Sequence, residues 1–399
     1  MGNAKRNALL FALAGISAVA AARVGIGLYK VYRPYEATVA APGDGAFQPS
    51  ARVLELLNRT DAAAPTMDGS HPCVFEAVGQ SGAPPQIGKC NLPVTLSGPV
   101  DRLEADLRYG NFVLRQTDLY LKDIFDVPLT RTYNSGDFVS SNPVHAFGKY
   151  ANHPFDMGPL GTRFPYTEQM LVFEDGDFVY LPRISEGTSF QDAIYQHTET
   201  STEFYKAVTA WNGNGWTTWR TDGSAITFPE AYNAKSMAQG AATEMRDSDG
   251  DRLQLIRDAQ RNLLEIRTPH KHSIKFKYDD HARIIRAEDD QGHWSNYAYD
   301  GLGMLTDVTL SCGQKRHYSY NGDLMTAIED ESQRVLVRNT YDGRILSAQD
   351  FGDGQVYSYH YSRSANGFYA ESVEVTSPDG TTTRMGAGDS VPATLRQQR

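Results

Sequence analysis

The sequence is poor in cysteine and has no excess of basic residues. Its 399 residues include three cysteines, which are too few for a disulfide-rich fold or a thiolate metal cage. Asp and Glu number 48 against 38 Lys and Arg, which gives a formal net charge of −10. Because a nucleic-acid binder needs a basic face to neutralise phosphates, we expect no nucleic-acid partner.

Short catalytic motifs are also missing. The sequence contains no Gly-x-Ser-x-Gly, no His-Glu-x-x-His, no Cys-x-x-Cys and no phosphate-binding Gly-rich loop before a helix. His270 and His272 would share one face of a strand, as two metal ligands do. Pro269 before them favours a hairpin turn instead. We therefore expect no enzymatic activity, no cofactor and no metal site.

Two of the cysteines, Cys73 and Cys90, lie close together in a segment rich in Gly and Pro. In an exported protein they are candidates for a disulfide that closes a short loop. The alternative is two unpaired small hydrophobic residues. The third cysteine, Cys312, is expected to lie alone in a repeat strand.

An apolar run near the N-terminus, residues 8–22, follows Lys5 and Arg6. It has the length and the small residues of a cleavable signal peptide. Extended as far as Tyr29, the run is long enough to cross a bilayer, although Arg23 would be a costly interruption. We predict that residues 1–30 are a signal peptide or a hydrophobic membrane-anchoring helix.

The residues that follow change in character twice. Residues 31–99 are rich in Pro, Gly and Ala, as in an irregular linker. Only residues 50–57 have helical spacing there, with Ser50 as a helix cap. In residues 100–246, short runs of β-forming residues alternate with turn signals such as Asp175-Gly176 and Asp222-Gly223. We predict that this region is nearly all β.

Three tryptophans lie close together in the β-rich region: Trp211, Trp216 and Trp219. Tryptophan rings stack on sugars, so these residues are candidates for a carbohydrate-binding platform. Rings of this size also pack in protein cores and hairpins, which is the more common role. The sequence leaves both interpretations open.

The most regular feature is a tyrosine that recurs with an acidic or amide residue after it. Four tyrosines begin such a pair: Tyr278-Asp279, Tyr299-Asp300, Tyr320-Asn321 and Tyr341-Asp342. A fifth, Tyr361, continues the series without an acidic or amide residue after it, and the successive spacings are 21, 21, 21 and 20 residues. A fixed period of this size is typical of repeat architectures. We therefore set residues 247–381 apart as a repeat region, and residues 382–399, where the pattern stops, as a flexible tail.

Each period has the same order of parts: a turn, an apolar pair such as Ile284-Ile285, and a strand that returns to an aromatic triplet. Two strands and two turns fill about 21 residues. Since one repeat cannot bury its apolar face alone, stacked repeats supply the core. The predicted fold is all-β, with antiparallel β-strips and hairpins, stacked repeats in an open or partial spiral shell, and the N-terminal hydrophobic helix.

These repeats resemble the YD repeats of bacterial RHS proteins, which also occur in insecticidal toxin complexes and animal teneurins. Residues 109–111, 117–121 and 131–135 (Arg-Thr-Tyr-Asn-Ser) resemble the segment that precedes such repeats. The resemblance covers roughly residues 100–362 and implies a β-rich strip that spirals into a hollow shell. The Asp-Pro-rich core motif and the toxin domain of long members do not follow, so the chain is identified as a short member.

The residues and the resemblance together lead us to expect a non-catalytic RHS/YD-repeat β-scaffold for surface interaction. It would be exported to the bacterial cell envelope or secreted, and membrane-anchored if the N-terminal segment is retained. Its partner would be a cell-surface glycan or protein. Two alternatives are a carbohydrate-binding module and a remnant or component of an RHS polymorphic toxin system.

Overall fold

The computed structural model describes residues 48–58 and 104–386, apart from short gaps at 108, 125, 138–144, 162–163, 177, 199–202, 232–233, 235–236, 353 and 364–369. These residues form antiparallel strands with few helices. The predicted all-β fold is confirmed. The predicted N-terminal helix, residues 1–30, and the Cys73–Cys90 pair lie outside the described residues. No helix in the described part is long and apolar enough to cross a membrane.

The dominant element is one continuous antiparallel sheet, which we call the strip. Each strand pairs with the next one in the sequence from β7 to β24. Its first strands precede the repeats: β7 (Ile194–Gln196), β8 (Val208–Trp211), β9 (Gly215–Trp219), β10 (Ala225–Pro229), β11 (Glu244–Arg246), β12 (Arg252–Arg257) and β13 (Leu263–Arg267).

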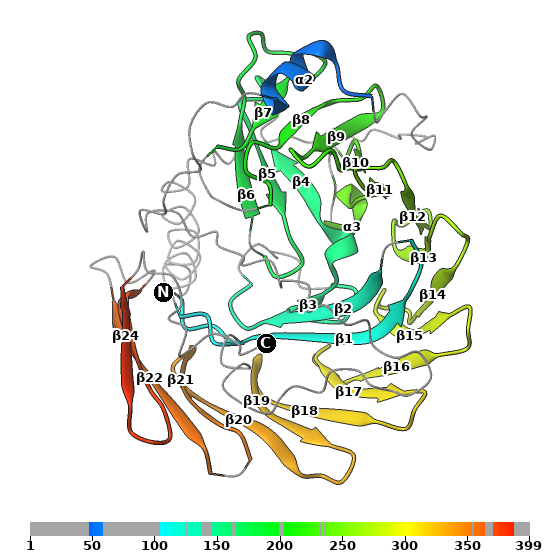
Figure 1. The fold of residues 1–399 in the computed structure, drawn as a ribbon. Coiled ribbons are helices and arrows are strands. Elements are labelled where there is room, and N and C mark those ends of the chain that lie inside the picture. Colours follow the sequence, from blue (N-terminus) through cyan, green and yellow to red (C-terminus); the bar gives the residue numbers. More distant parts are fainter. Residues whose placement is uncertain are drawn as a thin grey trace, which may run out of the picture.

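The remaining strands carry the repeats: β14 (Ser273–Tyr278), β15 (Ile284–Asp289), β16 (Trp294–Tyr299), β17 (Leu305–Leu310), β18 (Lys315–Asn321), β19 (Leu324–Asp330), β20 (Val335–Asp342), β21 (Ile345–Asp350), β22 (Val356–Arg363), β23 (Ala370–Thr376) and β24 (Thr382–Gly386). Each repeat is therefore one hairpin, as predicted. In Figure 1 the strip follows an open arc, with β7 and β24 at its two ends. Among the described strands no register joins β24 to β7, so the strip stays open.

Two smaller sheets lie inside the arc (Figure 1). The first, which we call the N-terminal sheet, consists of β1 (Val113–Leu121), β2 (Val127–Asn134) and β3 (Ala151–Asn152), and a 3-10 turn, η3 (Pro154–Asp156), follows it. The second consists of β4 (Gly158–Gly161), β5 (Glu168–Val172) and β6 (Phe178–Pro182), with the short helix α3 (Met237–Gly240) beside it.

One large hydrophobic core joins the N-terminal sheet to the strip. Leu114, Leu129 and Phe147 from the N-terminal region are buried against Ile284, Ile328 and other strip residues. A smaller cluster lies under helix α2 (Ala51–Leu57), where Val53 and Leu56 pack on Trp219 of β9. Ser50 accepts a hydrogen bond from the amide of Val53, so the predicted helix and its cap are confirmed.

Some sequence-based boundaries differ from the structure. The predicted tail begins inside β24, since residues 382–386 pair with β23 through Met385↔Val373 and neighbouring residues. Met385 is buried, and this apolar residue extends the sheet by one strand beyond the last tyrosine repeat. Cys312 lies in the turn between β17 and β18 rather than in a strand, because Gly313 takes a positive φ of 91° there.

Candidate functional site

The repeat tyrosines form a ladder of hydrogen bonds along the strip. Each hydroxyl donates to a backbone carbonyl of the preceding hairpin: Tyr278 to Leu263 (2.9 Å), Tyr299 to Ile284 (2.6 Å), Tyr320 to Leu305 (2.8 Å) and Tyr341 to Met325 (2.8 Å). Burial raises the pKa of these phenols above the usual 10, so each one remains a donor. We call this set of four tyrosines the tyrosine ladder.

A β-bulge explains why these carbonyls need a donor. At each repeat tyrosine the register shifts by one residue, so that Tyr299 faces Leu305 while Ala298 faces Asp307 and Thr306 is left over. The same shift occurs at Tyr278, Tyr320 and Tyr341. A bulge removes backbone groups from the ladder of strand hydrogen bonds, and buried backbone groups are almost always paired. The next repeat's tyrosine supplies the missing donor.

The amides at the same bulges are paired by the N-terminal region. The Ile284 amide donates to the carbonyl of Ala146 (2.7 Å), and the Leu346 amide donates to the carbonyl of Gly110 (2.8 Å). The Met325 amide donates to the hydroxyl of Tyr133 (3.2 Å). The strip is thus incomplete as a hydrogen-bonded structure until the residues that precede it are in place.

The acidic member of each pair shapes a turn. Asp279 accepts hydrogen bonds from the amides of His281 and Arg283, and Asp300 accepts from those of Leu302 and Met304. Asn321 and Asp342 instead begin tighter turns, in which Gly322 and Gly343 have positive φ. A carboxylate beside free amides stabilises such turns locally. The side chains of Asp279 and Asp300 are therefore structural.

The Asp-rich segment that opens the repeats is a turn of the same kind. Asp247 accepts from the amides of Asp249 and Asp251, and Gly250 has a φ of 89°. These hydrogen bonds and the positive φ of Gly250 identify the segment as a turn. Among the described residues, no group of three or more His, Cys, Asp or Glu side chains is arranged to hold a metal ion.

A buried ion pair anchors the N-terminal sheet on the strip. The Arg131 guanidinium on β2 contacts the Asp118 carboxylate on β1 (Nε to Oδ2, 3.1 Å), and both side chains are almost fully buried. Arg131 also donates to the hydroxyl of Tyr318 on β18 (2.9 Å), and the Ser295 hydroxyl of β16 donates to the carbonyl of Asp118 (2.9 Å). Gln116 completes this network through its contact with Tyr318.

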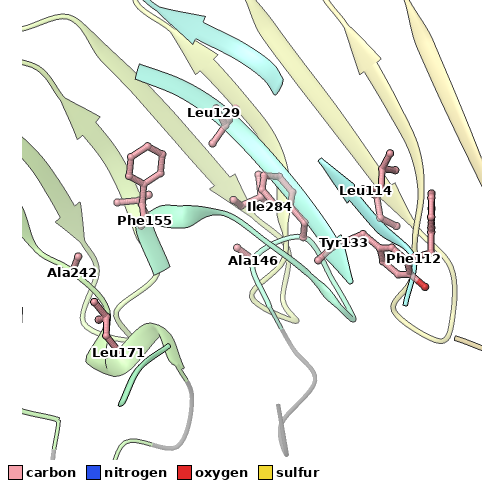
Figure 2. Packing of buried hydrophobic residues seen from close by; sticks show 14 of the residues in the cluster. Phe112, Leu114, Leu129, Tyr133, Ala146, Phe155, Leu171, Ala242 and Ile284 are labelled. Carbon is pink, nitrogen blue, oxygen red and sulfur yellow. The ribbon is translucent and has the colours of Figure 1, made fainter. Parts of the chain in front are cut away.

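A second anchor lies where β19 begins. The Tyr133 hydroxyl donates to the carbonyl of Asp323 (2.7 Å), and the Tyr150 hydroxyl donates to the carboxylate of the same residue (2.9 Å). Arg344 pairs with this carboxylate at 2.8 Å and donates to the carbonyl of Ser135. Figure 2 shows Tyr133 and Phe112 packed beside one another at this end of the sheet.

A third contact zone lies at η3 and contains an imidazole with no exposure, that of His153. Its ring lies near those of Phe147 (5.8 Å), Phe155 (5.8 Å) and Phe276 of β14 (6.2 Å, between centroids). Among the described residues, neither ring nitrogen has a hydrogen-bond partner. Figure 2 shows Phe155 on the same segment, among the buried side chains of the core.

Beside this ring, Arg257 of β12 binds the N-terminal region. Its guanidinium pairs with Asp156 (Nη1 to Oδ1, 2.8 Å) and donates to the carbonyls of Phe155 (2.5 Å) and Ala242 (2.9 Å). Burial would raise the pKa of Asp156, but the neighbouring His153 and Arg257 outweigh it, so that the pKa lies below its usual value. Asp156 is therefore ionised and paired. Arg257 stands one period before Tyr278, where the sequence has Arg-Asp in place of Tyr-Asp.

The turn that follows β13 meets the loop between β1 and β2. Asp123 accepts hydrogen bonds from the backbone and the ring of His270 (3.0 and 2.5 Å). Burial opposes ionisation of Asp123, but the hydrogen bonds from Thr268 and His270 lower its pKa to about 2. His272 pairs with a different carboxylate, Asp290 (2.8 Å). The two histidines lie in the predicted turn, and each has its own aspartate.

The tryptophans do not form the platform that we considered. Trp216 and Trp219 are buried, with 2% and 6% exposure, and they belong to different clusters on opposite faces of β9. Trp211 packs edge-on against Trp216 and Phe190. Residues three apart on a strand point to opposite faces, so one sugar ring cannot stack on both Trp216 and Trp219. Trp216 and Trp219 therefore pack in the core, and the three tryptophans share no common stacking face.

Cys312 is disulfide-bonded. Cys312 is therefore not the isolated cysteine that we expected. Its turn had no sequence signal for a disulfide.

Sequence reasoning identified the tyrosines but missed their partners. The structure joins Tyr278, Tyr299, Tyr320 and Tyr341 in one ladder, whereas Tyr361 donates to the carbonyl of Asp106 at 3.5 Å. Arg131, Asp118 and Tyr133 lie in the segments that carried the family resemblance, yet their contacts with the strip could not be predicted. The one available signal was the presence of Arg131 and Asp118 in strands that also carry several apolar residues.

Comparisons with known proteins bear on the region just described. Residues 105–176 match the family model "Domain of unknown function (DUF6531)". These residues include the N-terminal sheet and both anchors on it. The match covers less than half of the chain. No protein with curated annotation matches the sequence.

Among solved structures, the chain is similar to a TcdB2–TccC3–TEV complex, with 13% identity, 68% of this chain and 19% of that chain covered, and a TM-score of 0.29. It is also similar to a Photorhabdus luminescens Tc holotoxin pore, with 13% identity, 68% and 18% coverage, and a TM-score of 0.28. The chain thus spans about a fifth of the length of these structures. The family match therefore shows that residues 105–176 are similar to the DUF6531 family.

Proposed function

We propose that this protein is a non-catalytic RHS/YD-repeat β-scaffold that presents the outer face of its strip to a partner at the cell surface. The observation that supports this most is the use of the inner face by the chain itself. The N-terminal sheet fills the arc, and the tyrosine ladder, the bulge amides and the Asp turns are all engaged in internal contacts.

The outer face offers polar side chains on several strands of the strip. Lys275 and Lys277 of β14, His317 of β18 and Arg338 and Thr340 of β20 are exposed. Residues on alternate positions of a strand share one face, so these side chains alternate with the buried ones. A rigid sheet with this surface is suited to binding rather than to chemistry.

Export to the cell envelope is part of the proposal, and so is retention in the membrane if the apolar residues 8–22 are not removed. N-terminal sequencing of the protein from membrane and soluble fractions distinguishes a cleaved from a retained segment. Recovery of the uncleaved chain only from the cytoplasm would contradict export.

Site-specific photocrosslinking in living cells tests the interaction. A photoreactive residue at Lys277 or Thr340 on the outer face is expected to capture the same partner. The matched control places the photoreactive residue at Asp379, in the exposed β23–β24 turn, at the end of the strip. Absence of any adduct at Lys277 and Thr340 above the level at Asp379 would reject the outer face as a binding surface.

A further inference from the structure

The His153 imidazole lies at the contact between the N-terminal sheet and the strip. It follows β3 of the N-terminal sheet, and its ring packs on Phe276 of β14 in the strip. It has no exposure, and among the described residues neither ring nitrogen is hydrogen-bonded. A buried polar group without a partner costs stability, so this side chain is an unfavourable part of the interface.

The charged groups around the ring do not offer it a free partner. From η3, the Asp156 carboxylate lies 3.9 Å from Nε2, but its other oxygen is held by Arg257 of β12 at 2.8 Å. From the segment before β3, His145 is paired with Asp137 at 2.8 Å. Tyr278 of β14 also faces Asp156 and Arg257, and burial raises its pKa well above 10. A proton added to His153 would therefore meet one carboxylate that is already shared with a guanidinium.

Protonation thus costs more in the docked state than in water. Burial lowers the pKa of His153 below the usual 6.5, against the opposing attraction of Asp156. Because the docked state binds the proton more weakly, its stability is unaffected above about pH 6.5. It then falls as the pH drops from 6.5 toward the docked pKa.

We propose that His153 makes the contact between the N-terminal sheet and the strip sensitive to acid, so that protonation of this imidazole favours separation of the two. Separation would also free the bulge amides of Ile284, Met325 and Leu346, which the N-terminal region pairs. The inner face of the repeats would then become more available as the pH falls below about 6.5.

Amide hydrogen exchange of the full-length protein at pH 7.5 and 5.5, corrected for intrinsic exchange rates, measures this opening. In the wild type, protection of the Ile284 and Met325 amides is expected to fall by up to about tenfold for each pH unit below 6.5. His153→Leu fills a similar volume among three phenylalanines but cannot be protonated. The fall in amide protection of this variant between pH 7.5 and 5.5 should therefore be smaller than that of the wild type, by up to about tenfold for each pH unit below 6.5. Glu174, whose pKa burial raises to about 7, contributes equally to both proteins and cancels in the comparison.

His360→Leu, which removes an exposed histidine from β22, is the matched control and should behave as the wild type. An equal pH response in wild type and His153→Leu would overturn the proposal. If circular dichroism shows that His153→Leu does not fold, the titration of His153 in the wild type, followed by NMR of its ring, decides the question. A measured pKa below 6.5 supports the proposal, and a pKa of 6.5 or higher overturns it.

Discussion

At the scale of single residues, the repeat tyrosine acts through its hydroxyl rather than through its ring face. The phenol is the donor for a carbonyl that a bulge has removed from the strand pairing, as at Tyr299 and Ile284. The sequence shows the tyrosine and its period. Its acceptor is a backbone carbonyl, which every residue has, so the sequence does not indicate which carbonyl is the partner. For this reason the ladder could be located from the sequence while its chemistry could not.

Tyr299→Phe should lower the free energy of unfolding by about 1–2 kcal/mol, because it leaves the Ile284 carbonyl buried without a donor. Urea denaturation measures the change. The control is Tyr361→Phe, whose hydroxyl lies 3.5 Å from its acceptor and should cost about half a kcal/mol or less. Equal losses for the two variants would contradict the ladder.

Glu174 is a carboxyl whose ionised form is disfavoured in the folded state. Burial and the neighbouring Asp175 raise its pKa to about 7, against the attraction of Arg115. The folded protein therefore holds this proton more tightly than the unfolded chain, and stability falls as the pH rises from about 4.5 through 7.

Glu174→Gln should then stabilise the protein by about 1–3 kcal/mol at pH 8 and change little at pH 4.5. Thermal unfolding at the two pH values measures the difference. Glu186→Gln, at an exposed position, serves as the control. A stabilisation that is the same at both pH values would show that the carboxyl is not the cause.

At the scale of elements, the turns were the most predictable part of the fold. Asp-Gly pairs marked the hairpins correctly at Asp175-Gly176 and Asp222-Gly223. The sequence failed where a residue other than glycine takes positive φ. Residues 203–208 have strand-forming side chains, but 203–206 form a turn with Lys206 at a φ of 63°. The tertiary contacts of Phe204, which is buried, override the local preference there.

The turns after Asp279 and Asp300 provide a matched pair. The fourth residue is Ala282 in one, with a φ of 60°, and Gly303 in the other, with a φ of 85°. An L-residue in this region costs about 1–2 kcal/mol. Replacing such a residue by glycine removes this cost, but glycine also makes the unfolded chain more flexible, which cancels part of the stabilisation.

Ala282→Gly should therefore stabilise the protein by about half a kcal/mol, and Gly303→Ala should destabilise it by about 1 kcal/mol. Both changes are measured by chemical denaturation. A Cβ at Gly303 meets only flexible side-chain atoms, at 3.6 Å and beyond, so backbone strain is the only source of the loss. Destabilisation by Ala282→Gly would disprove this account of the turn.

At the scale of the whole molecule, the N-terminal sheet is bound to the strip by residues that are far apart in the sequence. The all-β class, the hairpin repeats and the open strip followed from period and turn chemistry. The docking of β1 and β2 inside the arc did not, because the pairs that hold it, such as Arg131 and Tyr318 or Ser295 and Asp118, share no local pattern.

Arg131→Met should destabilise the protein by about 3–5 kcal/mol, since it leaves the Asp118 carboxylate buried without its counter-charge. The control is Arg334→Met, which removes an ion pair whose guanidinium is 71% exposed and should cost less than about 1 kcal/mol. Urea denaturation compares the two. A loss of less than 1 kcal/mol for Arg131→Met would mean that the network does not anchor the sheet.

The order of these contacts along the chain bears on how the protein is made. Each hairpin of the strip pairs with its immediate neighbour. The Tyr133 hydroxyl and the Gly110 carbonyl, in contrast, accept hydrogen bonds from the amides of Met325 and Leu346, which are synthesised about 200 residues later. Synthesis runs from the N-terminus, so the sheet that fills the arc leaves the ribosome before the surface that covers it exists. Such late contacts slow folding and leave apolar strands open to aggregation. The nascent chain is therefore expected to depend on chaperones until its last repeats have emerged.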